Sequence, residues 1–298
     1  MSGKQHKREL RRQRQAARAA AQRRERRKTI QTIVVIVVVM AIGGVLVAVS
    51  VHSETRVAEE PTESPSAAPV ADVTPSDPTV AAGQAVAGTV PAAVRGDAPV
   101  ACGASQPSNA AASHPTFPGG PAQVLQPGQG YRAVLQTSCG RIVIDLDSQS
   151  SPVTVNSFVF LAQQRFFDGL EIFRNATSIG ALQTGSGTNN ALWDIGYTLR
   201  DELKSAAAQG YSPGTVAMAK TSAPNTAGSQ FFFVYNDKFT LPPTYTRFGT
   251  VVEGLDVLQR IGAIPAAGEQ GETPTQRVYI DSVTIEPLPA PSPPASPG

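Results

Sequence analysis

Residues 228–235, GSQFFFVY, are the stretch that decides the fold class of this chain. Consecutive aromatic residues next to Val favour a buried β-strand, where such side chains pack well. Because side chains alternate along a strand, Gln230 and Phe232 share one face. Phe231 and Phe233 share the opposite face, which can bury in a core. An amide beside a large ring on the first face is typical of a pocket for an apolar ligand. A core strand buried on both faces is the alternative.

The folded part of the chain is predicted to be mainly β. Apolar alternation and turn residues indicate strands at six places, namely 133–137, 141–147, 214–220, 230–235, 248–252 and 278–286. Ser151-Pro152 marks the start of one helix, and Gly262 marks the end of a second. Strands that outnumber helices and are joined by short turns favour a closed antiparallel β-barrel capped by two α-helices.

The positive charge of the chain is concentrated at its N-terminus. The 298 residues carry a net charge of +2, yet residues 1–28 hold twelve Lys or Arg against two Glu. The rest of the chain holds 13 basic and 21 acidic residues, a net charge of −8. A basic leader on an acidic body argues against nucleic acid as a partner, since a nucleic-acid-binding domain carries a basic stripe on its folded surface.

An aliphatic run follows the basic leader. Residues 33–51, IVVIVVVMAIGGVLVAVSV, contain no charged side chain. As a helix they would span about 28 Å, near the hydrocarbon thickness of a bilayer. We therefore predict a single transmembrane helix at 29–52 that contacts lipid through residues 33–51. Because Lys and Arg stay inside, residues 1–28 are expected in the cytoplasm and the C-terminal domain outside the cell membrane. A signal peptide cleaved near residues 48–50 is the alternative, although the run is longer than a typical signal core.

Two proline-rich segments flank the predicted domain, which covers residues 126–287. Residues 53–125 consist mainly of Pro, Ala, Ser, Thr and Gly, with Phe117 as their only aromatic side chain. Such a composition buries too little apolar area to offset chain entropy, so we predict a disordered linker. Residues 288–298 are predicted to form a second proline-rich tail.

Cys102 and Cys139 are the only cysteines of the chain. Both fall on the expected outer side of the membrane, where an oxidising compartment permits a disulfide. A bridge would pin the end of the linker onto the domain. Two unpaired thiols are the alternative, because spacing alone does not prove a bridge.

The predicted domain contains no imidazole. His6, His52 and His114 all precede residue 126. Their positions exclude Ser-His-Asp and Cys-His catalysis in the domain, together with His-containing zinc sites, so neither a metal nor a cofactor is expected. Rotation about an X–Pro bond fits this limit, since it makes and breaks no covalent bond. It needs an apolar pocket for the proline ring and a cation near the prolyl nitrogen.

Four segments within residues 131–286 occur in a characteristic order. They are TVNSFVFLAQQRFFDGLEIFR at 154–174, QTGSG at 183–187, GTVAMAKTSAPNTAGSQFFF at 214–233 and LPPTYTRFGTVVEGLDVL at 241–258. Together they resemble the cyclophilin family of peptidyl-prolyl cis-trans isomerases. The resemblance implies a barrel with two helices and a substrate class of unfolded or flexible polypeptides that contain proline. We expect the protein to be a monomer.

The resemblance also implies roles for seven side chains. Arg174 matches the catalytic arginine, which would donate a hydrogen bond to the prolyl nitrogen. Gln183 and Gln230 match amides that position the peptide. The other matching residues line the family's groove, and they are Ala219, Phe232, Leu241 and Tyr245.

Residues 173–181 depart from the family pattern. Phe173 replaces the His that usually precedes the arginine. The second aromatic ring of the pocket has no clear counterpart, because Ile179, Gly180 or Ala181 falls in its place. Two other functions therefore stay open. One is a module that binds proline segments without isomerising them, and the other is an envelope scaffold with a degenerate groove.

Overall fold

The computed structural model describes residues 72–96 and 98–288. The basic segment predicted at 1–28, the transmembrane helix predicted at 29–52 and nearly all of the tail predicted at 288–298 lie outside the described residues. Within the described ranges, no helix combines the length and the apolar character that crossing a bilayer requires.

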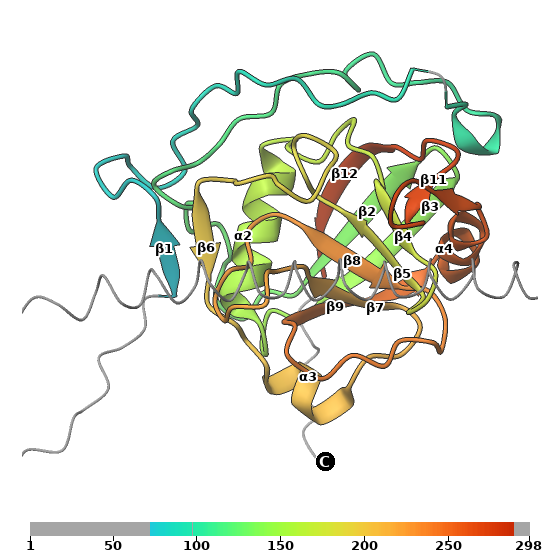
Figure 1. Cartoon of the computed structure of the whole chain (residues 1–298). Helices are drawn as coiled ribbons and strands as arrows, with labels where there is room; N and C mark the ends of the chain where they lie inside the picture. Colours follow the sequence, from blue (N-terminus) through green and yellow to red (C-terminus); the bar gives the residue numbers. More distant parts are fainter. Residues whose placement is uncertain (1–71, 97, 289–298) are drawn as a thin grey trace, which may run out of the picture. The chain divides into compact units, whose positions relative to one another are not determined.

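An eight-stranded antiparallel sheet is the main element of the described residues (Figure 1). Its strand order is β12-β2-β3-β9-β7-β8-β5-β4. The strands are β2 (Tyr131–Thr137), β3 (Gly140–Leu146), β4 (Arg174–Ala176), β5 (Ala181–Thr184), β7 (Thr215–Met218), β8 (Phe231–Val234), β9 (Arg247–Glu253) and β12 (Ile280–Pro287). The six strands indicated by alternation are present. The short strands β4 and β5 contain three and four residues, too few for a repeating pattern to show.

The sheet curls, but its two edge strands do not form a closing ladder within the described residues. The turn residues before β4 approach those before β12 instead, through an isolated bridge between Glu171 and Tyr279. Backbone hydrogen bonds flank this bridge, from Gly169 N to Ile280 O at 2.7 Å and from Ile172 N to Val278 O at 2.8 Å. The prediction of a closed barrel is therefore confirmed only as far as a curled antiparallel sheet.

Three α-helices and two small strand pairs accompany the sheet in the described part. The helices are α2 (Pro152–Gln163), α3 (Lys204–Gln209) and α4 (Leu255–Gly262), next to a short 3-10 helix η1 (Ala101–Gly103). The small pairs join β1 (Val73–Pro75) to β6 (Tyr197–Leu199) and β10 (Ala266–Ala267) to β11 (Thr273–Pro274). The two predicted helices are α2 and α4. The one-and-a-half-turn helix α3 was not predicted.

The start of α2 is held by a side chain that lies far away in sequence. Helix α2 begins at Pro152, as expected, but the Ser151 hydroxyl donates to Arg247 O at 2.8 Å instead of capping the helix. The buried carboxylate of Glu202 takes the capping role. It accepts from Val153 N at 3.2 Å and from Thr154 N at 2.9 Å. An anion at this end also complements the helix dipole.

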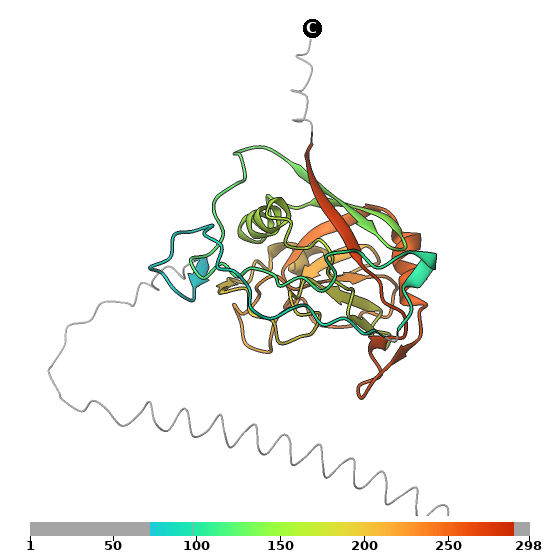
Figure 2. The same cartoon turned by 90° about the horizontal axis from the view of Figure 1, so that it is seen from above.

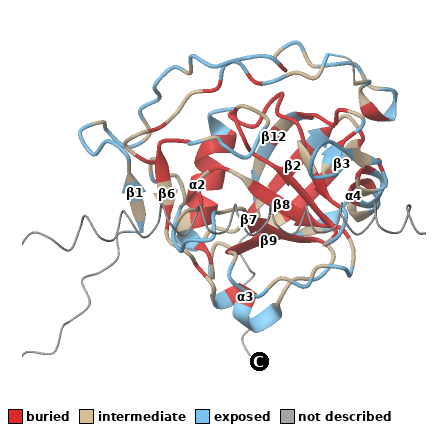
Figure 3. Ribbon diagram, viewed as in Figure 1, coloured by how far each residue is buried: buried red, intermediate tan, exposed pale blue. Residues whose placement is uncertain are grey.

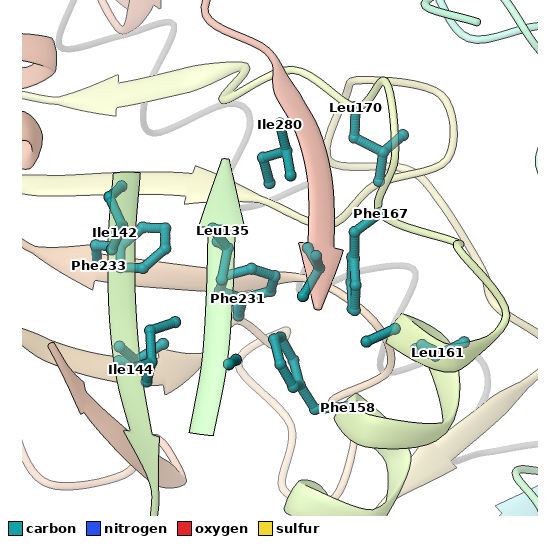
Figure 4. Close-up of a cluster of buried hydrophobic side chains, with 14 of the residues drawn as sticks. Leu135, Ile142, Ile144, Phe158, Leu161, Phe167, Leu170, Phe231, Phe233 and Ile280 are labelled. Atoms are coloured by element: carbon teal, nitrogen blue, oxygen red, sulfur yellow. The ribbon is translucent and has the colours of Figure 1, made fainter. Parts of the chain in front are cut away.

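Side chains on the two faces of β8 belong to two different apolar clusters, as the alternation predicted. Phe231 and Phe233 belong to the main core, between the sheet and α2 (Figures 3 and 4). Figure 4 shows them beside Ile142 of β3 and Phe158 of α2. Phe232 belongs instead to a second, smaller apolar cluster on the opposite face of the sheet. One strand therefore supplies both the core and the second face.

The prediction of a disordered linker at 53–125 is wrong for its described part. Residues 72–96 and 98–125, which we call the strap, run out along the domain and back (Figures 1 and 2). The two arms are joined by bridges between Val86 and Thr116 and between Pro91 and Ser113. The folded unit therefore begins well before the predicted boundary at residue 126.

A few side chains anchor the strap. Phe117 is fully buried and packs edge-on against Phe160 of α2, with ring centroids 5.0 Å apart. Cys102 forms a disulfide with Cys139, which confirms the predicted bridge. His114 is also buried, against Phe166, so one imidazole does belong to the folded unit. Average composition missed these contacts because a few well-placed anchors are enough to hold a segment of low apolar content.

Candidate active site

A groove of about 580 Å³ opens on the face of the sheet that carries Phe232. Its walls come from β4, β5, β8 and the loops around them. All seven predicted site residues line it, and they are Arg174, Gln183, Ala219, Gln230, Phe232, Leu241 and Tyr245. Their placement in one groove is a structural fact, whereas their roles in binding and catalysis stay predictions.

Strand register places the polar side of the groove. Arg174 of β4 pairs with Gln183 of β5, and Gln183 pairs in turn with Phe232 of β8. Arg174 Nη1 donates to Gln183 Oε1 at 2.9 Å, and Gln183 Nε2 donates to Gln230 Oε1 at 2.9 Å. Gln230 Nε2 then donates to Ala191 O at 3.2 Å. The guanidinium and the two amides thus form one continuous hydrogen-bonded chain.

Aromatic rings form the apolar side of the groove. Phe239 stacks on Phe232 with centroids 5.4 Å apart and an interplanar angle of 16°. Tyr245 meets Phe232 edge-on at 5.6 Å. The Tyr211 hydroxyl fixes the Tyr245 backbone, since it accepts from Tyr245 N at 2.9 Å and donates to Tyr245 O at 2.8 Å. Burial raises the pKa of Tyr211 to about 12, so this hydroxyl stays protonated at neutral pH.

The altered region before β5 has a defined place in the groove. Ile179 and Ala181 line it, while Gly180 does not. Gly180 has a φ of +65°, and a Cβ there would lie 1.9 Å from Asn236 Oδ1. The tight turn therefore requires glycine, and no ring can occupy this position. Phe239 supplies a second aromatic ring from another loop.

Sequence reasoning missed several residues in and beside the groove, and Phe239 and Glu272 are the two that matter most for the site. Phe239 follows β8 in an irregular loop, where no periodic pattern indicates which way a side chain points. Glu272 forms an ion pair with Arg174, with Nε and Oε2 2.6 Å apart, although 98 residues separate the two in sequence. No local signal predicts a contact of that kind.

A family model matches residues 132–285, and its description is cyclophilin type peptidyl-prolyl cis-trans isomerase/CLD. The chain therefore belongs to the cyclophilin type peptidyl-prolyl cis-trans isomerase family. Its fold and the order of its groove residues agree with that membership.

Several proteins similar to this chain are named as peptidyl-prolyl cis-trans isomerases. The chain is 36% identical over 197 residues to "Probable peptidyl-prolyl cis-trans isomerase B" of Mycobacterium leprae, a match that covers 60% of this chain and 65% of the relative. The protein of the same name from Mycobacterium tuberculosis is 39% identical over 165 residues, which cover 50% of this chain and 53% of the relative. The chain thus spans less than two thirds of these relatives.

A shorter relative is matched almost completely. Peptidyl-prolyl cis-trans isomerase-like 3 of Homo sapiens is 32% identical over 156 residues, which cover 51% of this chain and 93% of the relative. Among solved structures, a cyclophilin type peptidyl-prolyl cis-trans isomerase of Cryptosporidium parvum matches with a TM-score of 0.49 and 22% identity. That match covers 54% of this chain and 99% of the other.

Proposed function

We propose that this protein accelerates rotation about X–Pro bonds, with Arg174 as the catalytic residue. The barrier to this rotation is about 18–20 kcal/mol, because the amide nitrogen shares its lone pair with the carbonyl. A donor to the prolyl nitrogen draws that lone pair out of resonance as the bond twists. The hydrogen bond is stronger in the twisted state than in either planar isomer, and this difference is what catalysis requires.

One observation carries the proposal. The Arg174 guanidinium lines the same groove as the apolar ring of Phe232, and Gln183 joins the two in the strand register. The ring can receive the proline side chain, while the amides of Gln183 and Gln230 can bind the flanking peptide groups. The side chain of Arg174 is 40% exposed, so a substrate can reach it.

The test is a protease-coupled isomerisation assay on a short Ala-Pro peptide. Arg174→Ala should lower kcat/KM by about 100-fold or more, since each ~1.4 kcal/mol of lost transition-state stabilisation is worth tenfold. Arg141→Ala is the matched control. It removes an arginine whose ion pair with Glu253 is exposed and whose side chain does not line the groove. Equal activity of the two variants and the wild type would contradict the assignment.

We further propose that the substrates are unfolded or flexible polypeptides outside the cytoplasmic membrane. The charge-free residues 33–51 behind a basic leader support this location. The Cys102–Cys139 disulfide supports it independently, because such bridges persist in oxidising compartments. Protease added to intact cells should cleave the C-terminal domain if the proposal is right. Protection until the cells are lysed would contradict it.

A peptide-binding module without turnover is the second candidate. It is favoured by the groove wall at Ile179 and Ala181, which departs from the family pattern. That function predicts binding of the Ala-Pro peptide, measured by calorimetry, with no acceleration of isomerisation.

A further inference from the structure

Glu272 occupies one side of the Arg174 guanidinium. Its carboxylate accepts from Nε at 2.6 Å through Oε2 and from Nη2 at 3.2 Å through Oε1. Gln183 accepts from Nη1 on another side at 2.9 Å. A guanidinium has five N–H groups, so these three bonds leave one on Nη1 and one on Nη2. Both remaining donors are on the terminal nitrogens of a side chain that lines the groove.

We propose that Glu272 is a positioning residue for Arg174, an inference that rests on the proposed function. Glu272 is not among the residues that line the groove, whereas Arg174 lines it while paired with Glu272. The carboxylate therefore holds the guanidinium without removing it from the groove. Because the pair is partly exposed, it contributes little to folding stability. Its main effect is on the orientation of a long side chain with many rotamers.

The hairpin that carries Glu272 is hydrogen-bonded to Asn175, the residue after Arg174. Glu272 lies just before β11, in the β10–β11 hairpin. Asn175 N donates to Glu272 O at 2.7 Å, which ties the hairpin to β4. The fully buried side-chain amide of Asn175 donates to Gly262 O at 3.0 Å and to Ile264 O at 3.2 Å. The strand that carries the arginine and the hairpin that carries the carboxylate are therefore joined by backbone and side-chain hydrogen bonds.

Asn175 also lies within residues 173–181, which depart from the family pattern. The structure gives this departure a physical reason, since the Asn175 amide satisfies backbone carbonyls just before the hairpin. The Tyr235 hydroxyl donates to Asn175 Oδ1 at 3.2 Å and completes the arrangement. The altered residue thus anchors the hairpin whose carboxylate pairs with Arg174.

The first test measures kcat and KM of Glu272→Ala in the full chain, purified in mild detergent, on the Ala-Pro peptide. We expect kcat/KM to fall about 10- to 100-fold, as misplacement of a catalytic group by about 1 Å does. The loss should fall mainly on kcat, because Arg174 acts in the twisted state. Glu272→Gln keeps an acceptor of the same shape and should recover part of the rate. Glu253→Ala is the matched control, since it breaks the exposed pair with Arg141 and should leave the rate unchanged.

The second test separates positioning from a general structural role. In an Arg174→Ala background, Glu272→Ala should cause no further loss, because its target is already gone. An equal loss in both backgrounds would overturn the positioning role, as would a Glu272→Ala rate equal to or above wild type. A wild-type chain without isomerase activity would contradict the proposed function itself, together with this inference. An active wild type that Glu272→Ala leaves unchanged would contradict only the inference.

Discussion

Removal of the Cys102–Cys139 disulfide tests whether the strap is an integral part of the folded unit. The two cysteines are 37 residues apart in sequence. On the chain-entropy relation, a closed loop of this length contributes about 4 kcal/mol to the free energy of unfolding. For a unit of this size, 1 kcal/mol corresponds to roughly 2–4 °C in Tm. The double variant Cys102→Ser/Cys139→Ser should therefore melt about 8–16 °C below the wild type.

Local packing indicates that the strap should unfold together with the sheet. Ala101, next to Cys102, is fully buried, and its N–H donates to Arg277 O at 2.8 Å. Arg277 itself donates from Nε to Ala98 O at 2.7 Å. Loss of the bridge should thus lower the stability of the whole unit instead of only loosening the strap.

Thermal unfolding of the full chain, followed by circular dichroism, measures the shift. Reductant should lower the wild-type Tm to that of the double serine variant and should leave the variant unchanged, which is the internal control. The reasoning is refuted if the variant keeps the wild-type Tm while protease cleaves within the strap. That result would mean that the strap docks separately and that the bridge constrains only the strap.

Three further predictions concern single side chains. Glu202→Ala should destabilise the protein by about 1–2 kcal/mol in urea unfolding, because two amides at the start of α2 lose their acceptor. Glu202→Gln should cost less, and equal costs would contradict the capping role. Gln230→Ala should lower kcat/KM roughly tenfold, since it removes the acceptor that orients Gln183; an unchanged rate would exclude the hydrogen-bonded chain from catalysis. Burial lowers the pKa of His114 below its ordinary value, so the unfolded chain takes up the proton first as the pH falls. The stability that the neutral ring provides is present above about pH 6.5 and is lost as the pH falls through the lower folded-state pKa. The Tm should consequently fall less on acidification in His114→Phe than in the wild type, and parallel Tm curves would contradict this assignment.

The order of elements was predictable wherever the sequence repeats with the period of a strand or helix. The stretch around Phe232 is the clearest case, since its alternation predicted one face in the main core and the other in a groove. That Arg174 and Gln183 lie at the same face was predicted only from the family resemblance. The sequence pattern alone did not indicate it, because strand pairing between distant segments has no local signature. The register of β4, β5 and β8 now supplies the physical reason for their proximity.

The strap and the hairpin show where prediction from sequence failed. A mean composition describes a segment as a whole, whereas the strap is held by individual anchors such as Phe117 and Cys102. In the sequence, Glu272 looks like an ordinary acidic side chain on a surface turn. Only the three-dimensional structure shows its ion pair with Arg174. Both failures involve contacts between residues far apart in the chain, which propensity and periodicity do not describe.

The pairing of β1 with β6 attaches the first strand of the described residues to one wall of the groove. Val73 and Leu199 face each other in this pair, and Tyr197 and Thr198 of β6 line the groove. Ser76 N and Arg200 N extend the pair with bonds to Gly196 O at 3.0 Å and Asp72 O at 3.1 Å. The wall of the groove at Tyr197 and Thr198 therefore cannot move relative to residues 73–75 unless this short ladder breaks.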